Sequence, residues 1–92
     1  SSTGSATAVA ANFSVVSVGT DTDGSILSPA VQNSVVGIKP TVGLISRRGI
    51  IPFTYSQDTA SPFARTVTDA VILLGSLTWL DEKDVTTHKS KG

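Results

Sequence analysis

The change from valine-rich to polar sequence at Gly19 constrains the fold of this chain more than any other feature. The run from Phe13 to Val18 alternates only loosely and carries apolar residues on both faces, which predicts an inner strand of a sheet. The polar segment that follows at once, residues 19–25 (GTDTDGS), is bracketed by glycines. Segments of this type connect a strand end to a functional loop. We therefore expect a buried strand that ends in an exposed polar loop.

Further secondary structure is expected on both sides of that loop. The Ala-rich stretch from Gly4 to Asn12 predicts a short buried helix. After the loop, Pro29 limits residues 26–31 to at most one helical turn. A second strand is predicted at residues 35–38, and it ends before Pro40 because the residue preceding a proline avoids the helical region.

The next two segments read as irregular. Residues 41–51 hold two glycines and a pair of arginines, which suggests a hairpin-like excursion, and residues 52–62 are loop-like. Function often resides in such loops.

The clearest element is an amphipathic helix from Thr66 to about Thr78, with Thr66 as its N-cap and Asp69 three residues later. Its apolar stripe comprises Val67, Ala70, Val71, Leu74 and Leu77. Residues 81–92 are polar without apolar periodicity, so we expect an exposed, flexible tail after a domain segment spanning residues 1–80. The expected fold class is α/β, a sheet with helices packed on it.

The length and composition of the chain limit the partners and the chemistry to be expected. At 92 residues there is room for one domain, and with 5% aromatic residues its core is lean. Seven basic residues balance seven acidic ones, which gives no reason to expect nucleic acid or a membrane as partner. The absence of cysteine excludes a thiol nucleophile and suits a cytoplasmic protein, and no apolar stretch is long enough to span a bilayer.

Ser25 is the sharpest candidate for chemistry. It follows the predicted strand in a loop whose glycines, Gly19 and Gly24, permit unusual backbone geometry. A nucleophilic hydroxyl needs such an exposed turn, with consecutive N–H groups converging on a developing oxyanion. The same pattern also fits ordinary turn chemistry, and the residues by themselves leave both interpretations open.

Two ligand-binding interpretations of the loop fail on spacing. Asp21 and Asp23 precede Gly24 as in a calcium-binding loop, but the required acidic ligands would fall at Gly19 and Ala30. A phosphate-binding loop is excluded because no Gly-Lys-Ser/Thr follows at the required distance. No metal or cofactor is expected.

Other candidate groups have ordinary explanations as well. His88 lies in the polar tail, far from any element that could aim it, so a Ser-His-Asp triad is disfavoured. Lys39, between a strand and a proline, is more often a surface charge than a neutral base. The Arg47-Arg48 pair could anchor an acidic substrate, although a charge pair beside a glycine is more often a solvated turn.

Several ordered motifs together resemble those of the amidase signature family, a match that runs through about the first 75 residues. They are SSTGS at residues 1–5, GTDTDGSI at 19–26, Pro29-Ala30, VGIKPT at 36–41, Asp58, Pro62 and ARTV at 64–67. The resemblance implies a segment from the middle of a larger mixed-sheet α/β/α enzyme.

The resemblance also implies an amide hydrolase with a Ser-Ser-Lys triad that works without a cofactor. Ser25 matches the nucleophile and Ser1, 24 positions earlier, matches the relay serine. The N–H groups of Thr22, Asp23, Gly24 and Ser25 match the oxyanion hole. The base lysine of the family lies upstream of the serine-rich motif and is not in this chain; Lys39 belongs to another motif.

Two residues indicate which branch of the family this chain resembles and what kind of substrate is expected. Asp23 stands where many members of the family have glycine. In carrying aspartate at this position, the chain is similar to the peptide amidases of bacteria and related plant amidases. Leu27 stands where members that act on acidic substrates often have arginine, so a neutral amide or peptide amide is the expected substrate. The glutaminase component of an aminoacyl-tRNA amidotransferase and a non-catalytic fragment remain alternatives. The oligomeric state is left open.

Overall fold

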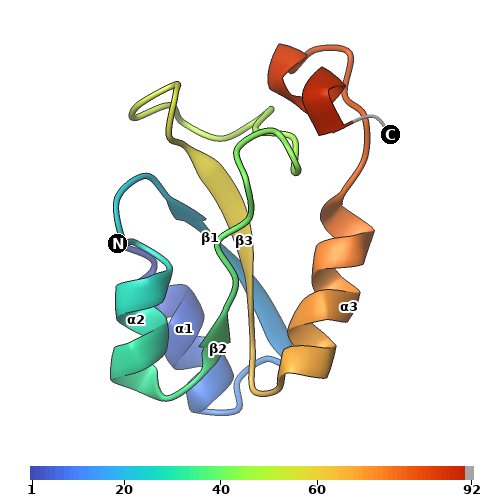
Figure 1. Cartoon of the computed structure of the whole chain (residues 1–92). Coiled ribbons are helices and arrows are strands. Elements are labelled where there is room, and N and C mark those ends of the chain that lie inside the picture. The colour runs from blue at the N-terminus through green and yellow to red at the C-terminus, as the bar shows by residue number, and fades with distance from the viewer. Residues whose placement is uncertain (91–92) are drawn as a thin grey trace.

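The structure, a computed structural model, describes residues 1–90, which form three α-helices, three strands and a terminal 3₁₀ helix (Figure 1). In chain order the elements are α1 (Thr3–Ala10), β1 (Val16–Asp21), α2 (Leu27–Asn33), β2 (Val36–Gly37), β3 (Thr59–Ala64), α3 (Val67–Leu77) and η1 (Val85–Ser90). The mixture of helix and sheet confirms the expected α/β class. None of the helices in this part of the chain is long and apolar enough to cross a membrane.

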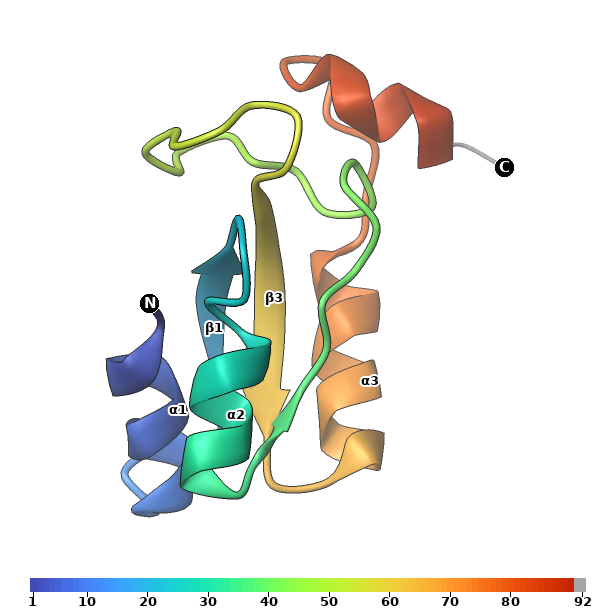
Figure 2. The same cartoon turned by 60° about the vertical axis from the view of Figure 1, so that its left-hand side comes forward.

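The three strands form one sheet in the order β1-β3-β2, and both pairings are antiparallel (Figure 2). The β1–β3 register runs from Val16 opposite Ala64 to Asp21 opposite Thr59. The end of β1 therefore lies beside the start of β3, and the loops that follow one and precede the other meet at the same edge of the sheet.

The central strand, β3, was not predicted, because residues 52–62 were expected to form a loop. All six of its residues are buried, so the alternation that marks a half-exposed strand is missing. Pro62 lacks a backbone donor, and proline is rare in central strands. Its carbonyl nevertheless accepts a hydrogen bond from the Ile38 N–H at 3.3 Å.

The first strand is displaced from the predicted range and lies at the edge of the described sheet. It begins at Val16 and continues through Gly19 to Asp21, while Phe13 and Val15 remain exposed. Backbone pairing with β3 carries the strand into polar sequence because the ladder needs N–H and C=O groups and no particular side chain.

Helix α2 is longer than the single turn that Pro29 was expected to allow. Pro29 is its third residue, where backbone N–H groups have no partner within the helix, so a proline is tolerated there. The helix ends at Asn33, and its C-cap residue Ser34 adopts the left-handed conformation with φ 55°.

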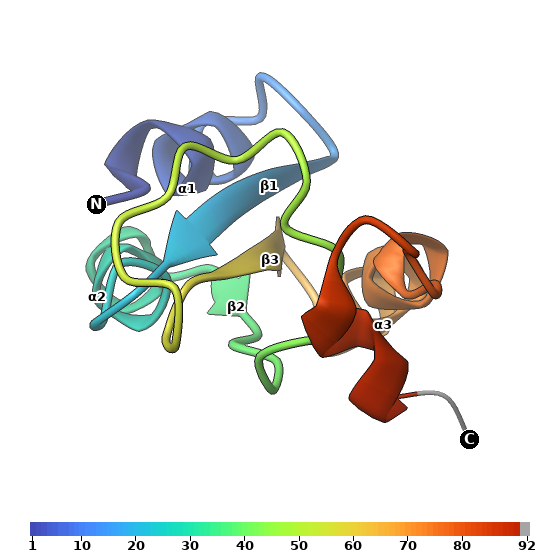
Figure 3. The ribbon, with the colours of Figure 1, turned by 90° about the horizontal axis from the view of Figure 1, so that it is seen from above.

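Helices cover both faces of the sheet. Helices α1 and α2 pack against one another and one face, and α3 lies against the other (Figure 3). The main core lies on the first face and contains Ala6, Val9, Ile26, Ala30 and Phe63. Helix α1 buries only two residues, Ala6 and Val9, so it is a surface helix with one buried face.

Helix α3 confirms the predicted range and its cap, since the Thr66 hydroxyl accepts a hydrogen bond from the Asp69 N–H at 3.2 Å. Its stripe is only partly buried: Ala70 is fully buried, whereas Val67 and Val71 are exposed. The hairpin expected within residues 41–51 is absent, and Ile45 forms a bridge with Thr78 instead.

The expectation of an exposed tail is wrong for part of residues 81–92. Asp81, Asp84 and Thr87 are buried, and the 3₁₀ helix η1 begins at Val85. The two aspartates are buried because they bond the segment at residues 46–48, which sequence periodicity cannot reveal. Residues 91–92 lie outside the described residues.

Candidate active site

The loop that carries Ser25 is wrapped around a buried carboxylate. Asp21, at the end of β1, accepts hydrogen bonds from the Gly24 N–H at 3.1 Å and from the Ile26 N–H at 2.7 Å. Gly24 has φ +85°, a conformation that side chains disfavour, and the turn made there leads into α2. Ser25 therefore lies half-buried between two residues whose backbone is fixed by one aspartate.

The N-terminal serines lie directly against this loop. The Ser2 N–H donates to the Ser25 carbonyl oxygen at 3.1 Å. The Ser2 hydroxyl donates to the Thr20 carbonyl at 2.9 Å and accepts from the Thr20 N–H at 3.0 Å. The fold thus brings Ser2, and with it the neighbouring Ser1, beside the loop that carries Ser25.

Gly19 makes this approach possible. A Cβ atom at position 19 would lie 2.6 Å from both Cβ and Oγ of Ser2 and 2.8 Å from the ring of Phe63. Any larger residue would therefore push the N-terminal serines away from β1.

The four N–H groups predicted to form the oxyanion hole differ in whether they already donate a hydrogen bond. The Gly24 N–H already donates to Asp21, so in this arrangement it is occupied. The N–H groups of Thr22, Asp23 and Ser25 have no backbone acceptor in the part of the chain that the structure describes. These three groups remain the candidates that could bind a developing oxyanion.

Asp58 fixes the loop from its other side. Its Oδ1 accepts a hydrogen bond from the Thr22 hydroxyl at 2.5 Å, and its carboxylate oxygens also accept from the N–H groups of Phe53 and Thr54. The Thr22 hydrogen bond and those from Thr54 and Phe53 lower the pKa of Asp58, despite the opposing effect of burial. Asp58 thus joins the Ser25 loop to residues 52–58.

Lys39 and His88, which the sequence analysis weighed as possible catalytic groups, lie in different surroundings. Lys39 forms an ion pair with the buried Asp21, at 3.5 Å between Nζ and Oδ1, so it is more than a solvated charge. His88 is exposed, as expected for a solvated residue. Among the described residues no group of three acidic or histidine side chains could hold a metal ion.

The arginine pair is divided between two environments. The Arg47 side chain is only 9% exposed, so the solvated-turn interpretation is wrong for it, whereas Arg48 is 52% exposed. The Asp84 carboxylate accepts from the Arg47 backbone N–H at 2.8 Å and from its Nε at 3.4 Å. Burial raises the pKa of Asp84, but the hydrogen bonds from Thr86 and Arg47 outweigh it and lower that pKa to about 2.

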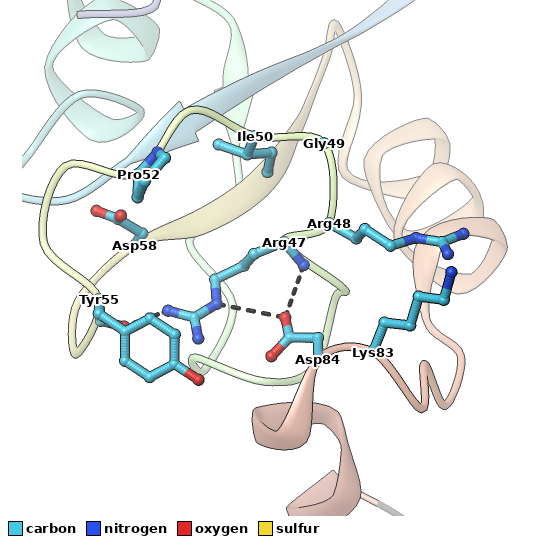
Figure 4. Close-up of a pocket in the computed structure, with 9 residues that line it drawn as sticks. All are labelled: Arg47, Arg48, Gly49, Ile50, Pro52, Tyr55, Asp58, Lys83 and Asp84. Atoms are coloured by element: carbon cyan, nitrogen blue, oxygen red, sulfur yellow. Dashed lines mark hydrogen bonds and ion pairs between the residues drawn. The ribbon is translucent and has the colours of Figure 1, made fainter.

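A cavity of about 320 Å³ lies beside these residues (Figure 4). It is lined by Arg47, Arg48, Gly49, Ile50, Pro52, Tyr55, Asp58, Lys83 and Asp84. Neither Ser1 nor any residue of the loop at positions 19–25 lines it; Asp58 connects the two regions through Thr22.

Sequence reasoning missed the aspartates that organise both regions. Asp21, Asp81 and Asp84 were assigned no structural role, and Asp58 was noted only as part of a motif. Each bonds residues that the fold brings to it, so no local spacing marks it. The only available signal was that aspartates in polar loops often bind backbone N–H groups.

Fold and loop together define a segment of an α/β protein that presents a serine at the end of a sheet strand. The family model described as Amidase matches residues 1–91. The chain belongs to this Amidase family.

Individual relatives agree with that assignment. A protein described as a probable amidase from Arabidopsis thaliana is 59% identical over 87 residues, covering 95% of this chain and 17% of the plant protein. A glutamyl-tRNA(Gln) amidotransferase component of Gloeothece citriformis is 54% identical over 95% of this chain and 18% of its own length. The chain therefore spans about one sixth of the length of the plant relative.

Solved structures show the same fold. The peptide amidase of Stenotrophomonas maltophilia is similar with a TM-score of 0.91 and 58% identity, over 92% of this chain and 18% of that one. An amidase family protein of Bacillus anthracis gives a TM-score of 0.94 with 54% identity, over 97% and 18% of the two chains. The structure thus reproduces a fragment of the amidase fold.

Proposed function

We propose that this chain is the nucleophile-bearing segment of an enzyme that hydrolyses linear amides, with Ser25 as the attacking residue. The observation that carries the proposal is the contact between two serine-bearing segments, in which Ser2 N–H meets the Ser25 carbonyl. Ser2 is thereby fixed against the loop that carries Ser25, and Ser1 immediately precedes Ser2. This proximity supports the proposed relay of a proton from Ser25 to Ser1.

The reaction would proceed in two steps. The Ser25 Oγ attacks the amide carbonyl carbon and gives up its proton through Ser1 to a lysine supplied from outside these 92 residues. The C–N bond then breaks, the amine leaves with a proton, and an acyl group remains on Ser25. Water hydrolyses this ester and restores the serine. Backbone N–H groups at positions 22, 23 and 25 would bind the negative oxygen in both steps.

A neutral amide is the proposed substrate. Leu27, two residues after Ser25, is 48% exposed at the start of α2 and offers no positive charge near the nucleophile. Comparing kcat/KM for two amides that differ only by a carboxylate near the scissile bond tests this, and a strong preference for the acidic member would contradict it.

A second candidate is the ammonia-releasing component of a tRNA amidotransferase. Its basis is the identity of 54% and 51% to two proteins named as glutamyl-tRNA(Gln) amidotransferase components. Glutamine carries a carboxylate and an ammonium group, so turnover of glutamine in preference to simple neutral amides would favour this candidate.

The test of Ser25 uses a segment replacement. This chain is introduced in place of the corresponding segment of the Stenotrophomonas peptide amidase, to which it is 58% identical. We expect hydrolysis of a neutral amide, loss of at least about 10³-fold in kcat with Ser25→Ala, and only a small change with the control Ser28→Ala. A fluorophosphonate probe should label Ser25; labelling of another residue would show that the mechanism is wrong.

A further inference from the structure

The loop that carries Ser25 is held by a buried carboxylate, and the charge of that carboxylate needs a counterion. Asp21 is only 1% exposed, and its two oxygens accept hydrogen bonds from the N–H groups of Gly24 and Ile26, one on each side of Ser25. A carboxylate removed from water is unfavourable unless hydrogen bonds and an opposite charge compensate it. The position of Ser25 therefore depends on how Asp21 is compensated.

Lys39 supplies the opposite charge. Its Nζ lies 3.5 Å from Oδ1 of Asp21, the same oxygen that accepts from the Gly24 N–H. No other cation among the described residues forms an ion pair with Asp21. The Lys39 side chain is 36% exposed, so water weakens this attraction without removing it.

The fold brings Lys39 to this point through strand β2. Gly37 is paired with β3, and the next N–H along the chain, that of Ile38, donates to the Pro62 carbonyl at 3.3 Å. Pro40 is buried and restricts the backbone conformation of the residue before it. The lysine side chain thus extends from a backbone that is held on both sides.

Strand β2 also packs against the start of α2. A Cβ atom at position 37 would lie 3.0 Å from atoms of both Ala30 and Ile26, so the strand and the helix are in close contact (Figure 2). Ile26 is also the residue whose N–H binds Oδ2 of Asp21, at 2.7 Å. The strand that leads to Lys39 and a residue held by Asp21 therefore belong to one packed unit.

The charge of Asp21 also affects the proposed chemistry. The three N–H groups that remain candidates for binding the oxyanion belong to the same loop as the Gly24 N–H, which Asp21 occupies. A negative charge close to a developing oxyanion raises the energy of that oxyanion, and a cation beside the first charge reduces the effect. An ion pair at Asp21 thus suits the reaction better than an isolated carboxylate.

We propose that Lys39 is a positioning residue for the reaction at Ser25. It acts on the loop through Asp21, whose charge it compensates, and it takes no proton from Ser25. The inference rests on the function proposed above for Ser25, and it gives Lys39 a role distinct from that of the lysine base supplied from outside these 92 residues.

The test uses the peptide amidase that carries this segment. Lys39→Met removes the charge, and we expect kcat to fall about tenfold or more while KM changes less than about threefold, because the loop and not substrate binding is affected. Lys39→Arg keeps the charge and should restore kcat to within a few-fold of the parent enzyme. The matched control is Lys83→Met, since Lys83 is exposed and forms no ion pair with any described residue; its kcat should be unchanged.

A double-variant cycle shows whether Lys39 acts through Asp21. Asp21→Asn should itself lower kcat, and in that background Lys39→Met should change kcat by less than about twofold. Both charges are absent from the double variant, so it buries no uncompensated carboxylate. Losses that multiply would show that Lys39 acts independently of Asp21 and would overturn the proposal.

Amide hydrogen exchange in the same enzyme gives a measurement that does not need activity. In Lys39→Met the N–H groups of residues 22–26 should exchange about tenfold faster than in the parent, while those of α3 keep their protection. If Ser25→Ala were as active as the parent, the proposed function would be wrong, and exchange would still show whether Lys39 holds the loop. Unchanged kcat or unchanged exchange in Lys39→Met would overturn the positioning role.

Discussion

At the scale of single residues, the approach of Ser2 to β1 depends on the absence of a side chain at position 19. We expect Gly19→Ala to destabilise the fold by about 1–3 kcal/mol, because the new Cβ would overlap Ser2 and the Phe63 ring. Gly4→Ala is the control: nothing lies within 4 Å of its Cβ position, and alanine favours the interior of α1. Urea unfolding of both variants measures the difference, and a neutral Gly19→Ala would contradict the proposed packing.

Three buried aspartates make the stability dependent on acid pH. Hydrogen bonds to the charged form lower the pKa values of Asp58 and Asp81, and that of Asp84 falls to about 2, from an ordinary value of 3.8. A carboxyl whose pKa is lower in the folded state stabilises that state above pH 3.8, and this contribution is lost as the pH falls through the folded pKa. The free energy of unfolding should therefore decrease between about pH 4 and pH 2.

The measurement is urea unfolding at about pH 5, 3 and 2, values that bracket this window. Asp84→Asn removes one titrating group and should flatten this dependence while lowering stability at the highest of these pH values. A pH profile unchanged by the substitution would mean that Asp84 ionisation does not contribute to folding.

At the scale of elements, α3 is the helix whose start depends on one identifiable side chain. Thr66→Ala removes the hydroxyl that accepts from the Asp69 N–H, and we expect a loss of about 1 kcal/mol. Thr66→Ser keeps the acceptor and should be close to the parent protein. Thermal unfolding followed by circular dichroism distinguishes the two; equal stability of all three proteins would show that the cap contributes nothing.

Some helices and strands could be predicted from local sequence patterns, and others could not. Helix α3 was predictable because its cap and apolar spacing are contained in one continuous segment. Strand β3 was not, since it lies between β1 and β2 in the sheet with helices packed on both faces, so all six of its residues are buried and no alternation marks it. Helix α2 was underestimated because Pro29 is restrictive only beyond the first turn.

At the scale of the whole molecule, we predict that the 92-residue chain alone has no amidase activity. In the mechanism proposed above the lysine base lies outside these residues, and general-base assistance typically contributes about 10²–10⁴ in rate. Large apolar residues such as Phe13 and Phe53 are 85% exposed, so the isolated chain lacks the packing that would hold its loops rigidly.

The assay incubates the purified chain with a neutral amide and measures released ammonia. The Ser25→Ala variant is the matched control for background hydrolysis. Turnover that depends on Ser25 would reveal a base within these residues and would contradict the prediction.

The sequence by itself determined the α/β class, helix α3, and the position of the Ser25 loop after a valine-rich strand. These features depend on neighbouring residues: a cap, a helical period, and a change from valine-rich to polar sequence. Only the tertiary structure decided that Gly24 donates to Asp21, that Asp58 binds Thr22, and that Asp81 and Asp84 fix the segment at residues 46–48. Such bonds join residues that the folded sheet brings together, and a hydrogen bond depends on distance in space, which linear order does not reveal.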